Sequence, residues 1–158
     1  MLIDHYKFPI SVTEELDLGS KITAYSREPW LKRLQHEGMI QYTYHGNFGV
    51  SQIISVSLTE KGKPYVIGQL KKRGWPNEGQ AFANVKLGEK VIQEITGIRH
   101  SQDKREATID YTWAYNNLTP FAKGWQGGFL FTESLTEGQT HSATAVAVLY
   151  DDGWRIAR

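Results

Sequence analysis

Five histidines are the side chains of this sequence that could most readily bind a metal ion or move a proton. None stands at a helical i, i+4 spacing to another ligand in a context that suggests a metal site, and the adjacent His36 and Glu37 would point apart on a helix. The chain has no cysteine, which excludes disulfides, thiolate ligands and a cysteine nucleophile. The sequence therefore predicts no metal site and no cofactor.

Carboxylates that could act as acid or base occur in two adjacent pairs, Glu14-Glu15 and Asp151-Asp152. Neighbouring side chains rarely converge on one substrate, and Asp151-Asp152 followed by glycine is accounted for by turn chemistry. Asp110 lies on the polar face of a predicted strand, where a solvent-facing carboxylate is the simpler interpretation. The chain also lacks a nucleophile elbow, a phosphate loop and a dinucleotide fingerprint. We therefore expect no enzyme activity.

Aromatic side chains gather near one predicted loop and form the candidate partner-binding surface. They flank the stretch Asn-Asn-Leu-Thr-Pro at 116–120, and they are Trp113, Tyr115, Phe121 and Trp125. Aromatic residues beside a loop can contact a protein or enclose a small apolar ligand. They can equally close the end of a sheet core, because large aromatics dominate burial in small domains. Both interpretations stay open at this point.

The elements that would position these residues are mainly strands, with one well-marked helix. Apolar spacing and a glycine stop at Gly38 predict a helix from about Ser26 to Glu37, and Ser11 to Glu14 has the form of a capping box. Period-two alternation predicts strands, which lie at 40–45, 50–58, 85–98 (one or two strands), 106–115, 142–150 and 154–157. A glycine at position 97 indicates a β-bulge.

A helix followed by a hairpin is the second half of a winged helix, a fold that often binds DNA. In that alternative, the exposed helix side would contact DNA through Lys32, Arg33, Gln35 and His36. Two observations argue against it: residues 34–60 contain no Lys or Arg, and little sequence precedes the helix to form a support helix. We therefore expect nucleic-acid binding to be the alternative and not the leading function.

Together these elements predict an α+β fold, in which a winged-helix-like helix–hairpin lobe packs with a twisted antiparallel β-sheet. The predicted division is a lobe at 1–70, a linker at 71–80 and an antiparallel β lobe at 81–158, with one shared core as the alternative. The formal charge of +1 gives no general attraction to nucleic acid or anionic membranes. No stretch has the length and apolarity of a membrane span.

A series of short motifs between residues 30 and 125 resembles small bacterial lipoproteins of unknown function. The motifs are L-x-x-L-x-x-x-G-M-I (31–40), LTEKGK (58–63), GEKVIQEI (88–95), ATIDYTW (107–113) and FAKGW (121–125). The family carries a cysteine near a position where this chain has Ala81-Phe82-Ala83-Asn84. The resemblance implies an exported, non-enzymatic protein, tethered to a membrane only through a lipid anchor that this chain does not contain.

The leading functional prediction is a non-enzymatic binding or accessory protein of the bacterial cell envelope, with an unknown protein or small apolar ligand as partner. The first alternative is a winged-helix DNA-binding regulator, and the second is an immunity-type protein that inhibits another protein. The predicted location is the periplasm or the outer membrane, or the cytoplasm if Met1 is the native start.

Overall fold

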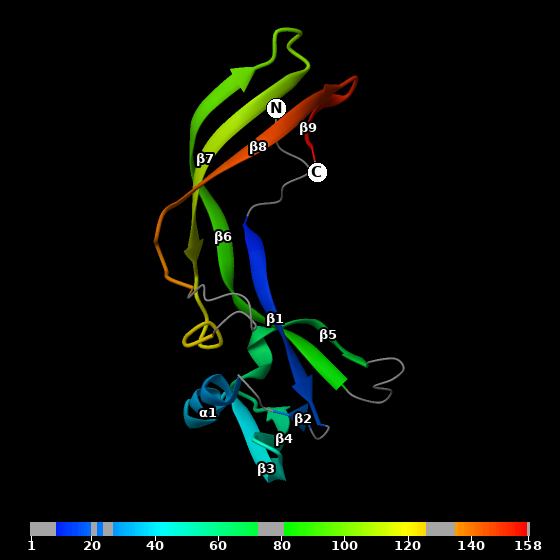
Figure 1. The fold of residues 1–158 in the computed structure, drawn as a ribbon, viewed down its shortest axis with the longest axis vertical. Helices are drawn as coiled ribbons and strands as arrows, with labels where there is room; N and C mark the ends of the chain where they lie inside the picture. The colour runs from blue at the N-terminus through cyan, green and yellow to red at the C-terminus, as the bar shows by residue number, and fades with distance from the viewer. Residues whose placement is uncertain (1–8, 20–21, 24–26, 73–80, 126–134, 158) are drawn as a thin grey trace. The chain divides into compact units, whose positions relative to one another are not determined.

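The computed structural model describes residues 9–19, 22–23, 27–72, 81–125 and 135–157. Strands hold 63% of the described residues, and these residues form one α-helix (Figure 1). The elements are β1 (Ile10–Leu18), β2 (Ile22–Thr23), α1 (Glu28–His36), β3 (Ile40–Phe48), β4 (Ser51–Leu58), the 3₁₀ turn η2 (Lys63–Tyr65), β5 (Val66–Lys72), β6 (Ala81–His100), β7 (Glu106–Asn116), β8 (His141–Tyr150) and β9 (Gly153–Ile156).

The strands form two sheets. The larger sheet has the order β1-β6-β7-β8-β9, with β5 also paired to β6, and the smaller sheet has the order β2-β4-β3. Every strand pair whose register is described is antiparallel. The chain is therefore a mostly β protein.

Two compact units interleave along the chain. The first unit comprises Met1–Ser11, Glu89–Asn117 and Thr136–Arg158, and the second comprises Val12–Gly88 and Leu118–Leu135. The sequence instead indicates consecutive lobes joined at 71–80. Lys71 and Lys72 of that predicted linker lie in β5, and residues 73–80 lie outside the described residues.

The second unit contains the main hydrophobic core. Apolar side chains from α1, both sheets and the loop after β7 bury one another there, and they are Leu16, Leu18, Trp30, Leu31, Leu34, Met39, Ile40, Ile54, Val56, Ala83, Val85, Leu87, Phe121 and Ala122. The helix contributes its predicted apolar side and ends at His36, and Gly38 follows the cap with a φ of +73°, which suits a residue without a side chain. The predicted start of the helix, Ser26, lies outside the described residues.

The winged-helix-like α+β prediction is wrong. The helix and the hairpin after it form as predicted, but α1 is the only α-helix among the described residues. The segment before it is strand β1, not a support helix, and β1 pairs within the large sheet. Ser11 to Glu14 lies in this strand, so the predicted capping box is also wrong. Val12 and Leu16 are four residues apart, and both a helix and an alternating strand place residues at this spacing on one side. The burial of Leu16 and Leu18, two residues apart, fits the alternation of a strand.

Most of the predicted strands are confirmed, with two differences in extent. β6 is one strand of 20 residues, and the register shift between Ile95 and Gly97 confirms the predicted bulge. β3 continues to Phe48, so the hairpin turn lies at Gly49 and Val50, later than predicted. Strand β5 was not predicted, because its apolar residues alternate only briefly before two lysines.

Candidate functional site

One face of the sheet in the first unit is strongly apolar, and it forms the candidate site. Cross-strand partners in an antiparallel sheet share a face, so the register assigns each side chain to a side. Ile92 pairs with Trp113, Ile95 with Tyr111 and Ile98 with Ile109. On the other side of β7, the partners of these three β7 residues on β8 are His141, Ala143 and Ala145, and each set of paired residues forms one cross-strand row. The apolar face of β6, β7 and β8 therefore comprises Ile92, Ile95, Ile98, Ile109, Tyr111, Trp113, Ala143 and Ala145.

Two bulges bring the β6 isoleucines to the same side. Ile92, Ile95 and Ile98 are three residues apart, and in a regular strand that spacing would place neighbours on opposite faces. The register shifts once between Ile92 and Glu94 and again between Ile95 and Gly97. Each shift absorbs one residue, so all three isoleucines face the same way.

Parts of this face are open. Ile95 is 52% exposed and Ile98 is 49% exposed. Ile109 is buried, and it lies on β7, between β6 and β8 in the sheet. Farther along, the rings of His100 and Trp154 approach to 5.7 Å, although β7 and β8 separate their strands in the sheet. The His100 and Trp154 side chains therefore reach toward each other across the sheet. The residues of β7 and β8 between them are the small, buried alanines Ala107 and Ala147. The open area is centred on the two β6 isoleucines.

An aromatic cluster borders the apolar face. Trp113 stacks on His141 with ring centres 4.3 Å apart, and Tyr115 meets Trp113 edge-on at 5.0 Å. The Nζ atom of Lys90 lies 3.7 Å from the centre of a Trp113 ring, a cation–π contact. Because β6 and β8 flank β7 on opposite sides, Lys90 and His141 reach Trp113 from opposite directions. Trp113 is thus held firmly and forms a fixed wall, not a free stacking platform.

The opposite face of the same strands is mostly polar. Asp110 accepts a hydrogen bond from Thr144 Oγ1 at 2.8 Å and forms an ion pair with Arg99 at 2.9 Å. Thr108 and Thr112 lie beside it on β7. Val146 and Tyr150 are exposed large apolar residues there, at 41% and 52%. Asp110 is therefore engaged in a surface network and takes no part in the apolar face.

The predicted aromatic quartet divides between the two units. Trp113 and Tyr115 lie in the first unit, in the aromatic cluster. Phe121 and Trp125 lie in the second unit, where Phe121 is fully buried and Trp125 packs against the core and donates from Nε1 to Glu14 at 3.0 Å. Phe121 is therefore a core residue and does not contribute to a partner-binding surface.

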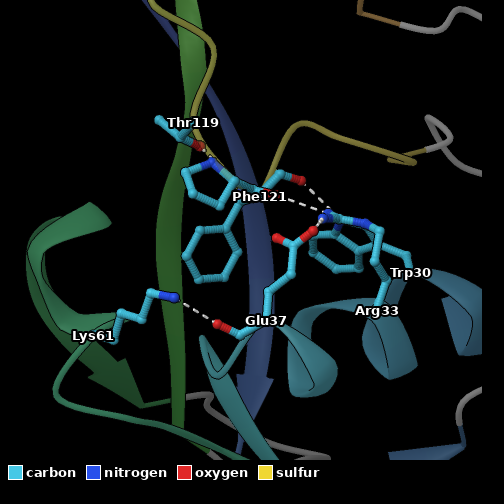
Figure 2. Close-up of polar contacts among 7 residues, drawn as sticks. Trp30, Arg33, Glu37, Lys61, Thr119 and Phe121 are labelled. Carbon is cyan, nitrogen blue, oxygen red and sulfur yellow. Dashed lines mark hydrogen bonds and ion pairs between the residues drawn. The ribbon is translucent and has the colours of Figure 1, made fainter.

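A polar network holds the Phe121 loop to the helix (Figure 2). Trp30 Nε1 donates to the Phe121 carbonyl at 2.7 Å, and Arg33 donates to the Pro120 carbonyl at 2.7 Å. Thr119 secures the loop to β6 through its backbone N–H, which donates to the Leu87 carbonyl, and through its Oγ1, which donates to the Lys86 carbonyl. The network therefore joins the loop, the helix and β6 within the second unit.

The four residues of the DNA-binding alternative are mostly engaged within the protein. Lys32 pairs with Glu28, and that hydrogen bond raises the pKa of Lys32 above its usual value. Arg33 forms an ion pair with Glu37 at 2.7 Å in addition to its Pro120 contact, and Gln35 donates to the Tyr42 carbonyl at 3.4 Å. His36 is exposed. Three of the four residues, Lys32, Arg33 and Gln35, therefore already have a partner within the protein.

The sequence patterns did not identify the β6 isoleucines (Ile92, Ile95 and Ile98), Lys90 or His141 as parts of the site. The period-two pattern of β7 identified the apolar side of that strand, but the partners of each residue depend on the bulged register of β6. Within the described residues, no group of three or more His, Asp or Glu side chains could hold a metal ion. In the same part of the chain, no helix has both the length and the apolarity needed to cross a membrane.

The chain was compared with protein-family models, curated proteins and solved structures, and none of them matches it.

Proposed function

We propose that this chain is a non-enzymatic binding protein that holds an apolar segment of a partner protein on the apolar face of β6, β7 and β8. One observation carries the proposal: Ile95 and Ile98 stand about half exposed on the same face as the fixed Trp113. Contiguous exposed apolar surface is typical of interaction sites. A firmly held tryptophan beside it can anchor a partner at little cost in conformational entropy.

The charge at the border of the face indicates the chemistry of the partner segment. Tyrosines apart, the titratable side chains on this side of β6, β7 and β8 are Lys90, His100 and His141. The carboxylate of Glu137, a residue that bridges to Tyr115, accepts a hydrogen bond from the Asn117 N–H. A partner that places a carboxylate near Lys90 would meet complementary charge, whereas a basic segment would not. We therefore propose an apolar segment flanked by acidic residues. A location in the cell envelope stays part of the proposal, and it rests on the sequence motifs alone.

An apolar anionic dye, 1-anilinonaphthalene-8-sulfonate, tests whether the face is open to such a partner. The folded protein should bind the dye with enhanced, blue-shifted fluorescence. The double variant Ile95→Glu/Ile98→Glu should bind it at least about tenfold more weakly, because it removes apolar area and adds negative charge.

Val146→Glu is the control for position: like each single exchange of the double variant, it places one new negative charge at a comparably exposed apolar residue, here on the opposite face. This variant should bind the dye as the unaltered protein does. All variants must retain a cooperative thermal transition, because partly unfolded proteins also bind the dye. Equal binding by the double variant and the control would refute the proposed surface.

A further inference from the structure

Two apolar side chains at the turn of the β3–β4 hairpin are strongly exposed. Phe48 is 76% exposed and Val50 is 100% exposed, on either side of Gly49. Tyr44, lower on the same hairpin, is 52% exposed. Keeping two large apolar side chains mostly in water does not stabilise the fold, so this tip is a candidate contact surface in its own right.

The hairpin holds its tip outward. The strands stay paired up to Phe48 and Ser51, which leaves Gly49 and Val50 as the turn, and Gly49 takes a φ of +59°. Below the tip, Tyr42 donates to Gln52 at 2.5 Å, and a hydrogen bond of 2.8 Å joins His45 Nε2 and Ser55 Oγ. Burial raises the pKa of the Tyr42 hydroxyl above its usual value, so it stays a neutral donor at physiological pH. These contacts hold the two strands together below the turn, across the bulge that the register shift between Tyr44 and Gly46 marks.

The charge of the hairpin selects the kind of partner. Residues 39–59 contain no Asp, Glu, Lys or Arg. A hairpin without formal charge pays no charge desolvation on entering an apolar medium, and it has no cation with which to seek phosphate or carboxylate groups. This combination fits the interface of a lipid bilayer better than the charged rim of a typical protein or nucleic-acid site.

We infer that the β3–β4 tip inserts into a bilayer interface. Phe48 and Val50 enter the boundary of the acyl chains, and Tyr44 lies at the level of the headgroups, where amphipathic rings are favoured. Two apolar side chains give only weak, reversible attachment to the bilayer. The absence of cations makes the binding independent of anionic lipid and of salt. This inference does not depend on the proposed function of the first unit.

The lack of cysteine allows a clean test with one introduced label. Val50→Cys carries a nitrobenzoxadiazole dye, whose emission rises and shifts to the blue in an apolar medium. Asp151→Cys, at the exposed β8–β9 turn, carries the same dye as the control. Each protein is titrated with phosphatidylcholine vesicles, and then with vesicles that also contain phosphatidylglycerol, in low and in high salt.

The Val50 label should respond to both kinds of vesicle, equally in both salt conditions, and the Asp151 label should not respond. Phe48→Ser in the Val50→Cys protein should raise the lipid concentration needed by about tenfold. Its melting temperature should not change, because Phe48 is exposed. Absence of any response at Val50 would overturn the inference and favour a protein contact at the tip. A response only to anionic vesicles, lost in high salt, would also overturn it.

Discussion

Replacing Gly62 with alanine should destabilise the second unit severely. Gly62 is buried, and a Cβ atom added there would lie 2.1 Å from the Met39 carbonyl oxygen. Backbone atoms cannot give way as the end of a side chain can, so the turn must move. It is fixed by Thr59, whose carbonyl accepts the Gly62 N–H at 3.0 Å and whose Oγ1 donates to the Gly38 and Met39 carbonyls. We expect a loss of about 3 kcal/mol or more in the free energy of unfolding.

Urea unfolding followed by circular dichroism measures this loss. Gly97→Ala in β6 is the control, because a Cβ there meets Asp110 Oδ2 at 3.4 Å, an ordinary contact. Its effect should stay within about 1 kcal/mol. A Gly62→Ala protein as stable as the Gly97→Ala protein would show that the turn after β4 is not packed as described.

Phe121→Ala should produce the second large loss of stability. The Phe121 ring is fully buried, contacts Tyr65 with ring centres 5.8 Å apart and closes the core beneath the loop after β7. Removing a buried phenylalanine side chain leaves a cavity, which typically costs about 3–5 kcal/mol. The Trp30 hydrogen bond to the Phe121 carbonyl holds the backbone in place, so the loop cannot readily collapse into the space.

Phe121→Leu is the companion variant, since it keeps most of the apolar volume and should cost clearly less than alanine. Thermal and urea unfolding of both proteins give the comparison. The result also governs how binding data are interpreted, because a loss of binding in Phe121→Ala would report unfolding and not a lost contact. Unchanged stability in Phe121→Ala would contradict the assignment of Phe121 to the core.

Local patterns predicted the elements in which one physical signal dominates. Period two along Glu106 to Tyr115 predicted β7, and Asp151-Asp152 before a glycine predicted the β8–β9 turn. The apolar spacing of Trp30, Leu31 and Leu34 predicted α1. The fold was mispredicted because the helix–hairpin order suits a winged helix as well as this arrangement. What decides between them is the pairing of β1 with β6, a contact between distant segments that no local pattern encodes.

The candidate site could be predicted only in part, because the rest of it also depends on the pairing of distant segments. Trp113 and Tyr115 follow from the alternation within β7, but Ile95 and Ile98 reach the same face only through the two bulges of β6. The glycine at 97 marked one bulge, and no residue marked the other. Lys90 and His141 come from strands on either side of β7, so their approach to Trp113 required the register.

The most direct test of the proposed function compares the two faces of the first unit in the cells that make the protein. A photo-cross-linking phenylalanine derivative is placed at position 95 in one variant and at position 146 in another, which are comparably exposed apolar residues on opposite faces. The account predicts a discrete protein adduct from position 95, weakened by Ile98→Glu, and none from position 146. The same adducts from both positions, or an adduct from position 146 alone, would contradict it.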